Sequence, residues 1–195
     1  MRTFVRHQLW PAVAILLALT IITGFIYPAA ITAIAQVAFP GQANGSFVKT
    51  ADGRTIGSSL IGQAFSDPKY FSGRLSAAGA DGYDANASAG SNLGPTNEAL
   101  IQRIQEQVDA LRAQNGDTPI PVDFVTTSAS GLDPDISPAT AQYQVAGVAK
   151  ARGMTEADVQ AAVARHTEQP LLGFLGQPRV NVLLLNLDLD GLLAR

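Results

Sequence analysis

A stretch of 42 residues without a formal charge, 7–48, constrains this chain of 195 residues more than any other feature. In its apolar centre, Leu9–Tyr27, only Thr20 and Thr23 carry polar side chains. An α-helix over this centre is roughly 28 Å long, which matches the hydrocarbon core of a bilayer. We therefore predict one transmembrane helix over residues 9–28, followed by a single folded domain.

The charges that flank this segment predict its direction. Arg2 and Arg6 precede it, whereas the next charged residue is Lys49. The positive-inside rule places such an N-terminus in the cytoplasm. The predicted protein is a single-pass protein of the cell inner membrane, with a cytoplasmic N-terminus at 1–8, a membrane-proximal linker at 29–44 and an extracytoplasmic (periplasmic) α+β domain at 45–195.

Two other interpretations of the apolar segment remain open at the level of sequence. Ala33-Ile34-Ala35 has the small-x-small pattern of a signal-peptide cleavage site, which would release the rest of the chain as an exported protein. The segment also has the composition of a helix buried in a protein core. The apolar run is longer than a usual signal sequence, so we favour the membrane anchor.

Composition excludes several classes of function. The chain has no cysteine, which rules out disulfides, thiolate nucleophiles and cysteine-ligated metals. Its formal net charge of −3 disfavours nucleic-acid binding, because a nucleic-acid binder needs a basic face. The only histidines, His7 and His166, stand far apart in sequence, and no phosphate-binding loop is present. We predict no catalytic residue, no metal site and no cofactor of its own.

Local signals after residue 45 predict a small sheet packed against helices. Asp52-Gly53 between two extended segments predicts a hairpin, and Ser137, Pro138 and Gly153 delimit a helix. Thr155 starts a further helix that Pro170 limits. A stripe at helical spacing (Leu100, Ile101, Ile104, Val108 and Leu111) predicts a core-facing helix, and alternating or apolar runs predict strands at 122–127 and 180–189.

Two polar loops rich in glycine and serine, 72–94 and 127–137, each lead into a predicted helix. Long loops mounted on a rigid scaffold are typical of contact surfaces. We therefore expect them to bind a partner. The residues that we assign to this contact are Arg74, Ser91, Asn92, Leu93, Gly94, Asn97, Ser128, Ser130 and Asp133.

Several blocks resemble those of a known family, the C subunit of the bacterial Kdp-type potassium-transporting P-type ATPase. The matching blocks are FSDPKYFSGRLSA at 65–77, YDANASAGSNLGPTN at 83–97, VDFVTTSASGLDPDIS at 122–137, QVAGVAKARG at 144–153 and the run from Val180 to Asn186. Because these blocks occur in order along the whole chain, the resemblance is specific.

The resemblance implies an accessory subunit of a high-affinity, ATP-driven potassium uptake pump, needed for its assembly and stability. The implied partners are a channel-like potassium-translocating subunit, a P-type ATPase subunit and a small single-span subunit, besides membrane lipid. Members of this family are described as catalytic chaperones that raise the ATP affinity of the ATPase subunit. In that description the glutamine matching Gln144 contacts nucleotide, and ATP and potassium act through the complex.

The predicted topology conflicts with the nucleotide role. An extracytoplasmic domain meets neither ATP nor the cytoplasmic part of an ATPase, so on physical grounds we favour a stabilising or gating role at the external mouth of the potassium subunit. The alternative from another functional class is a stand-alone exported protein that binds a ligand or nucleotide.

Overall fold

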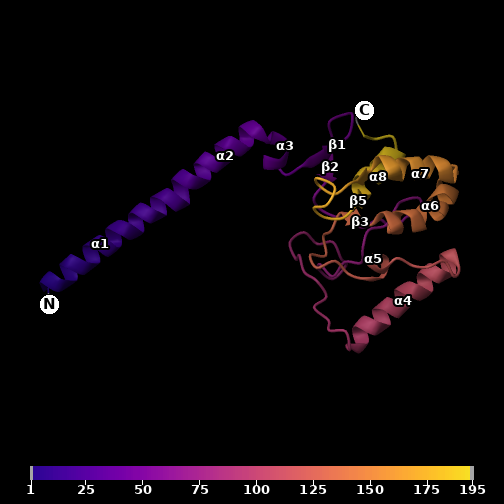
Figure 1. The fold of residues 1–195 in the computed structure, drawn as a ribbon, viewed down its shortest axis with the longest axis horizontal. Helices are drawn as coiled ribbons and strands as arrows, with labels where there is room; N and C mark the ends of the chain where they lie inside the picture. Colours follow the sequence, from indigo (N-terminus) through magenta and orange to yellow (C-terminus); the bar gives the residue numbers. More distant parts are fainter. Residues whose placement is uncertain (1, 194–195) are drawn as a thin grey trace. The chain divides into compact units, whose positions relative to one another are not determined.

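The computed structural model describes residues 2–193, and its contacts divide into two compact units that meet between Phe47 and Val48. The first residue of the predicted segment 1–8 and the last two of the predicted domain 45–195 lie outside the described residues. A helix makes up most of the first unit, and a mixed helix and sheet domain forms the second (Figure 1). The predicted α+β class, with an apolar N-terminal helix ahead of one domain, is confirmed.

Most of the N-terminal unit is one continuous helix. It consists of α1 (Arg2–Ile21), a π-helical turn η1 (Ile22–Ile26) and α2 (Tyr27–Ala38). Among the described residues, only its stretch Phe4–Ala38, 35 residues long, is long and apolar enough to cross a membrane. None of that stretch is buried within the protein, so the interpretation as a core helix is wrong.

The helix continues ten residues beyond its predicted end at residue 28, so most of the predicted linker 29–44 is helical. Pro28 lies in the first turn of α2 and lacks an N–H, which deprives the Gly24 carbonyl of its α-helical partner. The π-helical turn directly before it absorbs this defect, with the Tyr27 N–H bonded to the Ile22 carbonyl. Residues 29–38 contain no further glycine or proline, and a short helix α3 (Pro40–Ala43) follows.

The domain begins with the predicted hairpin, β1 (Phe47–Lys49) and β2 (Thr55–Ser58), which turns at Gly53 with a φ of 84°. A second, antiparallel sheet has the order β3-β5-β4, formed by β3 (Asp135–Ile136), β5 (Arg179–Asn181) and β4 (Thr167–Glu168). Its register pairs Ile136 with Val180 and Thr167 with Val180. The sequence predicts one small sheet, and the structure has two.

Three helices build the core around that second sheet: α6 (Pro138–Arg152), α7 (Glu156–Arg165) and α8 (Val182–Leu189). Figure 1 shows them packed side by side at one end of the domain. Fully buried side chains fill the space between them and β5: Phe71, Ile136, Ala141, Val145, Val159, Val180 and Leu185. A smaller cluster, in which Val48 meets Leu183 and Leu187, attaches the hairpin to α8.

Local capping signals predict the helix ends correctly. The Ser137 hydroxyl accepts a hydrogen bond from the Thr140 N–H at the start of α6, and Gly153 ends α6 in the left-handed conformation. The Thr155 hydroxyl caps α7 by accepting from the Asp158 N–H. These helices begin and end where short-range hydrogen bonds favour it.

Both predicted strands outside the hairpin are largely wrong. Residues 122–125 form a short helix, α5 (Val122–Val125), and the predicted strand 180–189 is extended only at Val180 and Asn181 before α8 begins. Asn181 caps α8, because its side-chain oxygen accepts a hydrogen bond from the Leu184 N–H at 3.1 Å. The alternating leucine and polar residues after Asn181 therefore lie on α8. Leu185, Leu187 and Asn186 are buried there.

The stripe on α4 (Glu98–Asn115) is also less buried than predicted. Only Leu111 is buried, whereas Ile101 is largely exposed and Leu100, Ile104 and Val108 are intermediate. The helix contacts α6 near its C-terminal end, where the Tyr143 hydroxyl donates to the Leu111 carbonyl. Within the described residues, most side chains of the stripe are therefore not buried against the rest of the domain.

Asp123 joins α5 to the first turn of α6. Its carboxylate accepts hydrogen bonds from the Ser137 N–H at 2.9 Å, the Ser137 hydroxyl at 3.0 Å and the Thr140 hydroxyl at 2.8 Å. Burial by itself would raise the pKa of this carboxyl, but the hydrogen bonds outweigh burial and hold the pKa below its ordinary value.

We expect Asp123→Asn to be less stable at pH 7 by about 1–2 kcal/mol. A carboxyl whose pKa is depressed by folding stabilises fully above its unfolded pKa of about 4, and this stabilisation is lost as pH falls through the folded value. The parent chain should therefore lose stability more steeply than Asp123→Asn below about pH 4. Urea denaturation in detergent across this range measures the difference, with the exposed Asp117→Asn as control. Parallel pH profiles for parent and Asp123→Asn would contradict the assignment.

Candidate functional site

The two polar loops, predicted as separate docking elements, lie against each other and form one unit, which we call the loop pair (72–94 with 127–137). Leu75 and Thr127 form an isolated parallel bridge, and the Ser128 N–H donates to the Leu75 carbonyl at 3.2 Å. Two serine hydroxyls continue the pairing: Ser76 donates to the Gly131 carbonyl at 2.6 Å, and Ser88 donates to the Ser130 carbonyl at 2.9 Å.

Glycine is required where the two loops approach most closely. At Gly131, which has a φ of 68°, a Cβ would lie 2.6 Å from the Ala89 carbonyl oxygen and 2.7 Å from the Ala78 Cβ. Because backbone lies at this distance, a side chain here forces the loops apart. The glycine-rich composition therefore serves contact within the loop pair.

An ion pair closes one edge of the loop pair. Arg74 Nη1 lies 3.1 Å from Asp133 Oδ2, and Arg74 Nη2 donates to the Thr127 carbonyl at 3.2 Å. The Tyr83 hydroxyl donates to the Arg74 carbonyl at 2.5 Å. Burial, and secondly the charge of Asp133, raise the pKa of Tyr83 to about 12, against a smaller opposing effect of Arg74. Tyr83 is therefore a neutral donor that supports the backbone next to the ion pair.

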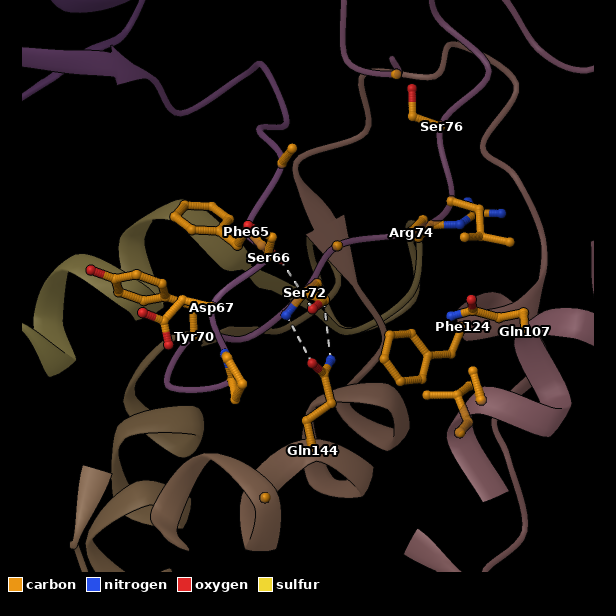
Figure 2. Close-up of a pocket in the computed structure, with 18 of the residues that line it drawn as sticks. Phe65, Ser66, Asp67, Tyr70, Ser72, Arg74, Ser76, Gln107, Phe124 and Gln144 are labelled. Atoms are coloured by element: carbon orange, nitrogen blue, oxygen red, sulfur yellow. Dashed lines mark hydrogen bonds between the residues drawn. The ribbon is translucent and has the colours of Figure 1, made fainter. Parts of the chain in front are cut away.

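Side-chain amides from two helices hold the start of the first loop. Asn186 on α8 accepts from the Phe71 N–H at 2.8 Å and donates to the Phe71 carbonyl at 2.9 Å. Gln144 on α6 does the same for the next residue, accepting from the Ser72 N–H at 2.8 Å and donating to its carbonyl at 3.1 Å (Figure 2). Each amide thus satisfies both main-chain groups of one residue, as a neighbouring strand would. We call these contacts the amide clamps.

A pocket of about 780 Å³ lies beside the second clamp. Figure 2 shows Gln107 of α4 and Phe124 of α5 on the side of Arg74, and Gln144 of α6 pointing toward Ser72 of the first loop. The size of the pocket is in the range of small-molecule sites. Gln144, however, directs its amide at Ser72 and uses both of its polar atoms there.

The sequence-predicted contact residues occupy different places. Arg74, Ser91, Ser128, Ser130 and Asp133 come together in the loop pair, since Ser91 receives a hydrogen bond from Thr127 at 3.5 Å. Ser128 is buried, and its hydroxyl accepts from the Gly131 N–H, so it stabilises its own loop. Asn97 caps α4 by accepting from the Ala99 N–H, and Asn92, Leu93 and Gly94 lie on the segment that leads to that cap.

The sequence did not predict a role for three residues that organise the site, Asn181, Asn186 and Tyr83. The signal available for Asn186 is an amide within the apolar run 180–189, for which the sequence predicts a strand. In the structure, Asn186 is 1% exposed. Across residues 2–193, no group of three or more histidine or acidic side chains is arranged to hold a metal ion.

With the site described, the sequence of the chain can be compared with those of known proteins. The family model described as KdpC, the c chain of the K+-transporting ATPase, matches residues 9–191. The chain belongs to the KdpC family. Three curated relatives, each named as a potassium-transporting ATPase KdpC subunit, are similar over nearly their whole length.

The relative from Sorangium cellulosum is 61% identical over 186 residues, which cover 94% of this chain and 97% of the relative. The one from Caulobacter vibrioides is 58% identical over 183 residues, or 94% and 92%. The one from Herpetosiphon aurantiacus is 57% identical over 192 residues, or 97% of each. The predicted KdpC resemblance is confirmed. These names denote one subunit of an ATPase, which also confirms the prediction of a subunit rather than an enzyme by itself.

The amide clamps generate a stability prediction. We expect Gln144→Ala and Asn186→Leu each to lower the free energy of unfolding by about 2–4 kcal/mol, because each leaves the N–H and carbonyl of one residue without partners. Asn186→Leu keeps the number and branching of the side-chain heavy atoms, but its methyl groups are bulkier, so its effect combines the lost hydrogen bonds with crowding in the core. Urea denaturation in detergent, followed by near-ultraviolet circular dichroism, measures both.

The matched control is Gln142→Ala, an exposed glutamine on the same helix, whose effect should stay within about 0.5 kcal/mol. If Gln144→Ala is no less stable than this control, the clamp at Ser72 does not contribute to the fold.

Proposed function

We propose that this chain is a non-catalytic accessory subunit of a potassium-transporting P-type ATPase, anchored in the cell inner membrane by Phe4–Ala38. Family membership and the names of the relatives support the pump, and the unburied apolar helix supports the anchor. Arg2 and Arg6 lie at the start of this helix, ahead of the uncharged stretch 7–48, and favour a cytoplasmic N-terminus. The folded domain then faces the extracytoplasmic side.

The loop pair is the observation that supports an assembly role. Its two loops are held by main-chain hydrogen bonds, an ion pair and close glycine packing, so their outer residues form a preformed surface. A preformed surface loses little conformational entropy when it docks. We propose that the exposed residues of the loop pair, including Asn92 and Ser130, dock on the potassium-translocating subunit, and that the helix packs beside the ATPase subunit and the small single-span subunit.

The family resemblance also implies a chaperone effect on the ATP affinity of the ATPase subunit, through Gln144. We propose that Gln144 acts by positioning the first loop. Its amide is already engaged with Ser72, and the proposed topology separates it from cytoplasmic ATP. Any effect on nucleotide affinity then passes through contacts between subunits.

Cysteine labelling tests the topology. The chain has no cysteine of its own, so Ser130→Cys and Thr3→Cys each introduce a single thiol. We expect a membrane-impermeant maleimide to label Ser130→Cys in spheroplasts, and Thr3→Cys only after the membrane is permeabilised. The reverse pattern would place the domain in the cytoplasm and restore direct nucleotide contact at Gln144.

Co-purification tests docking. Ala129 is an exposed alanine on the loop pair, and Ala161 is an exposed alanine on α7. Because a large charged side chain obstructs a close interface, we expect Ala129→Arg to reduce the recovery of partner pump subunits about tenfold, and Ala161→Arg to leave it unchanged. Circular dichroism of both variants checks that the fold is retained. Full recovery with Ala129→Arg would exclude this face as the docking surface.

A further inference from the structure

A second surface is built quite differently from the loop pair. The apolar loop, residues 169–178, joins β4 to β5 and contains no charged residue. Leu171, Leu172 and Phe174 are 70%, 75% and 72% exposed, and Leu175 is 51% exposed. Four large apolar side chains exposed within five residues are unusual for a folded domain and mark a contact with another protein or with a membrane.

The backbone holds these side chains out from the domain. Leu171 and Leu175 exchange two main-chain hydrogen bonds, at 3.1 and 2.9 Å, which close a three-residue turn. Within that turn Leu172 has a φ of 56° and Gly173 a φ of 80°. A leucine in the left-handed region is unfavourable, and here no burial of its side chain compensates. The turn thus presents apolar groups at a tip.

Polarity changes in steps from this tip to its base. The apolar tip is flanked by Gln169-Pro170 on one side and Gln177-Pro178 on the other. At the base, Arg179 pairs with Glu168 at 2.5 Å and with Asp135 at 3.1 Å. This order of polarity matches that of a bilayer interface. The apolar tip corresponds to the hydrocarbon, the flanking glutamines to the headgroups and the charged base to water.

We propose that the apolar loop inserts its tip into the interface of the bilayer that holds the N-terminal helix, an inference that rests on the proposed membrane anchor. Residues 39–47 join the end of α2 to Val48, and a connection of this length spans about 30 Å at most. The domain is therefore tethered close to the end of its helix. Such a tether gives the loop a high effective concentration near lipid, so a modest intrinsic affinity is sufficient.

Lipid fits this loop better than a protein partner. Apart from two glutamines, the loop offers no polar side chain that would select a particular surface, whereas insertion into fluid hydrocarbon requires only apolar area. The loop pair, with its ordered polar groups, has the opposite character. The two surfaces therefore serve different contacts.

Fluorescence of the full chain in vesicles tests the insertion. Phe174→Cys, in a chain without other cysteines, is labelled with an environment-sensitive nitrobenzoxadiazole dye and reconstituted into phosphatidylcholine vesicles. We expect a blue-shifted emission, and quenching by brominated phosphatidylcholine about threefold stronger than for the same dye at Gln105→Cys, an exposed position on α4.

A substitution provides a matched control. Leu172→Gln should weaken the quenching of the dye at position 174, whereas Ile101→Gln, which changes an exposed apolar residue on α4, should leave it unchanged. Both positions are exposed, so both variants should retain the circular dichroism of the parent.

Other outcomes overturn the proposal in distinguishable ways. If the chain fails to float with the vesicles, the membrane anchor is wrong and the proposed function fails with it. If the chain floats but the dye at position 174 stays in water, the loop proposal alone is wrong. If the dye becomes protected only after the other pump subunits are added, without quenching by brominated lipid, the occupant is a protein and the lipid proposal is wrong.

Discussion

Two side-chain amides support the irregular half of this domain. Residues 59–94 contain no helix or strand, yet Phe71 is completely buried in the main core. Burying Phe71 draws main-chain N–H and carbonyl groups into the interior, where unpaired polar groups are costly. Asn186 and Gln144 satisfy these groups at two consecutive residues, from two different helices. They supply the hydrogen bonds that a neighbouring strand would otherwise provide.

The loop pair depends on this attachment. Ser72 is the first residue of its first loop, and the clamps set where that loop leaves the core. From there Leu75 reaches Thr127, and the second loop returns to β3 and α6, the helix that carries Gln144. The α6 helix therefore holds the first loop through Gln144, the first loop contacts the second loop, and the second loop leads back to α6. A defect at Gln144 is therefore expected to reach the outer surface of the loops.

Local chemistry explains which parts of the fold were predictable. Ser137, Gly153 and Thr155 form short-range caps, so the bounds of α6 and the start of α7 follow from the sequence, as does the hairpin at Gly53. The apolar helix was predictable because its composition is extreme. Its true end was not, because a π-helical turn accommodates Pro28 without breaking the helix.

The two misassigned strands depended on distant partners. Asn181 switches the chain from strand to helix while also donating to the Ser59 carbonyl 122 residues away, and no local pattern contains that contact. Asp123 likewise lies in a run of strand-like residues, but its carboxylate is needed at the start of α6. For the candidate site, the sequence indicated the two loops and most of their polar residues. Their mutual pairing and the role of Asn186 required the tertiary structure.

The π-helical turn at Ile22–Ile26 has a mechanical consequence for the anchor. Together with Pro28 it interrupts the regular hydrogen-bond ladder, and helices bend most easily at such interruptions. It separates a first part, about as long as a bilayer core is thick, from a second apolar part that ends at Ala38. The two parts need not share one direction. Within the proposed anchor, the π-helical turn is therefore the position at which the helix bends most easily.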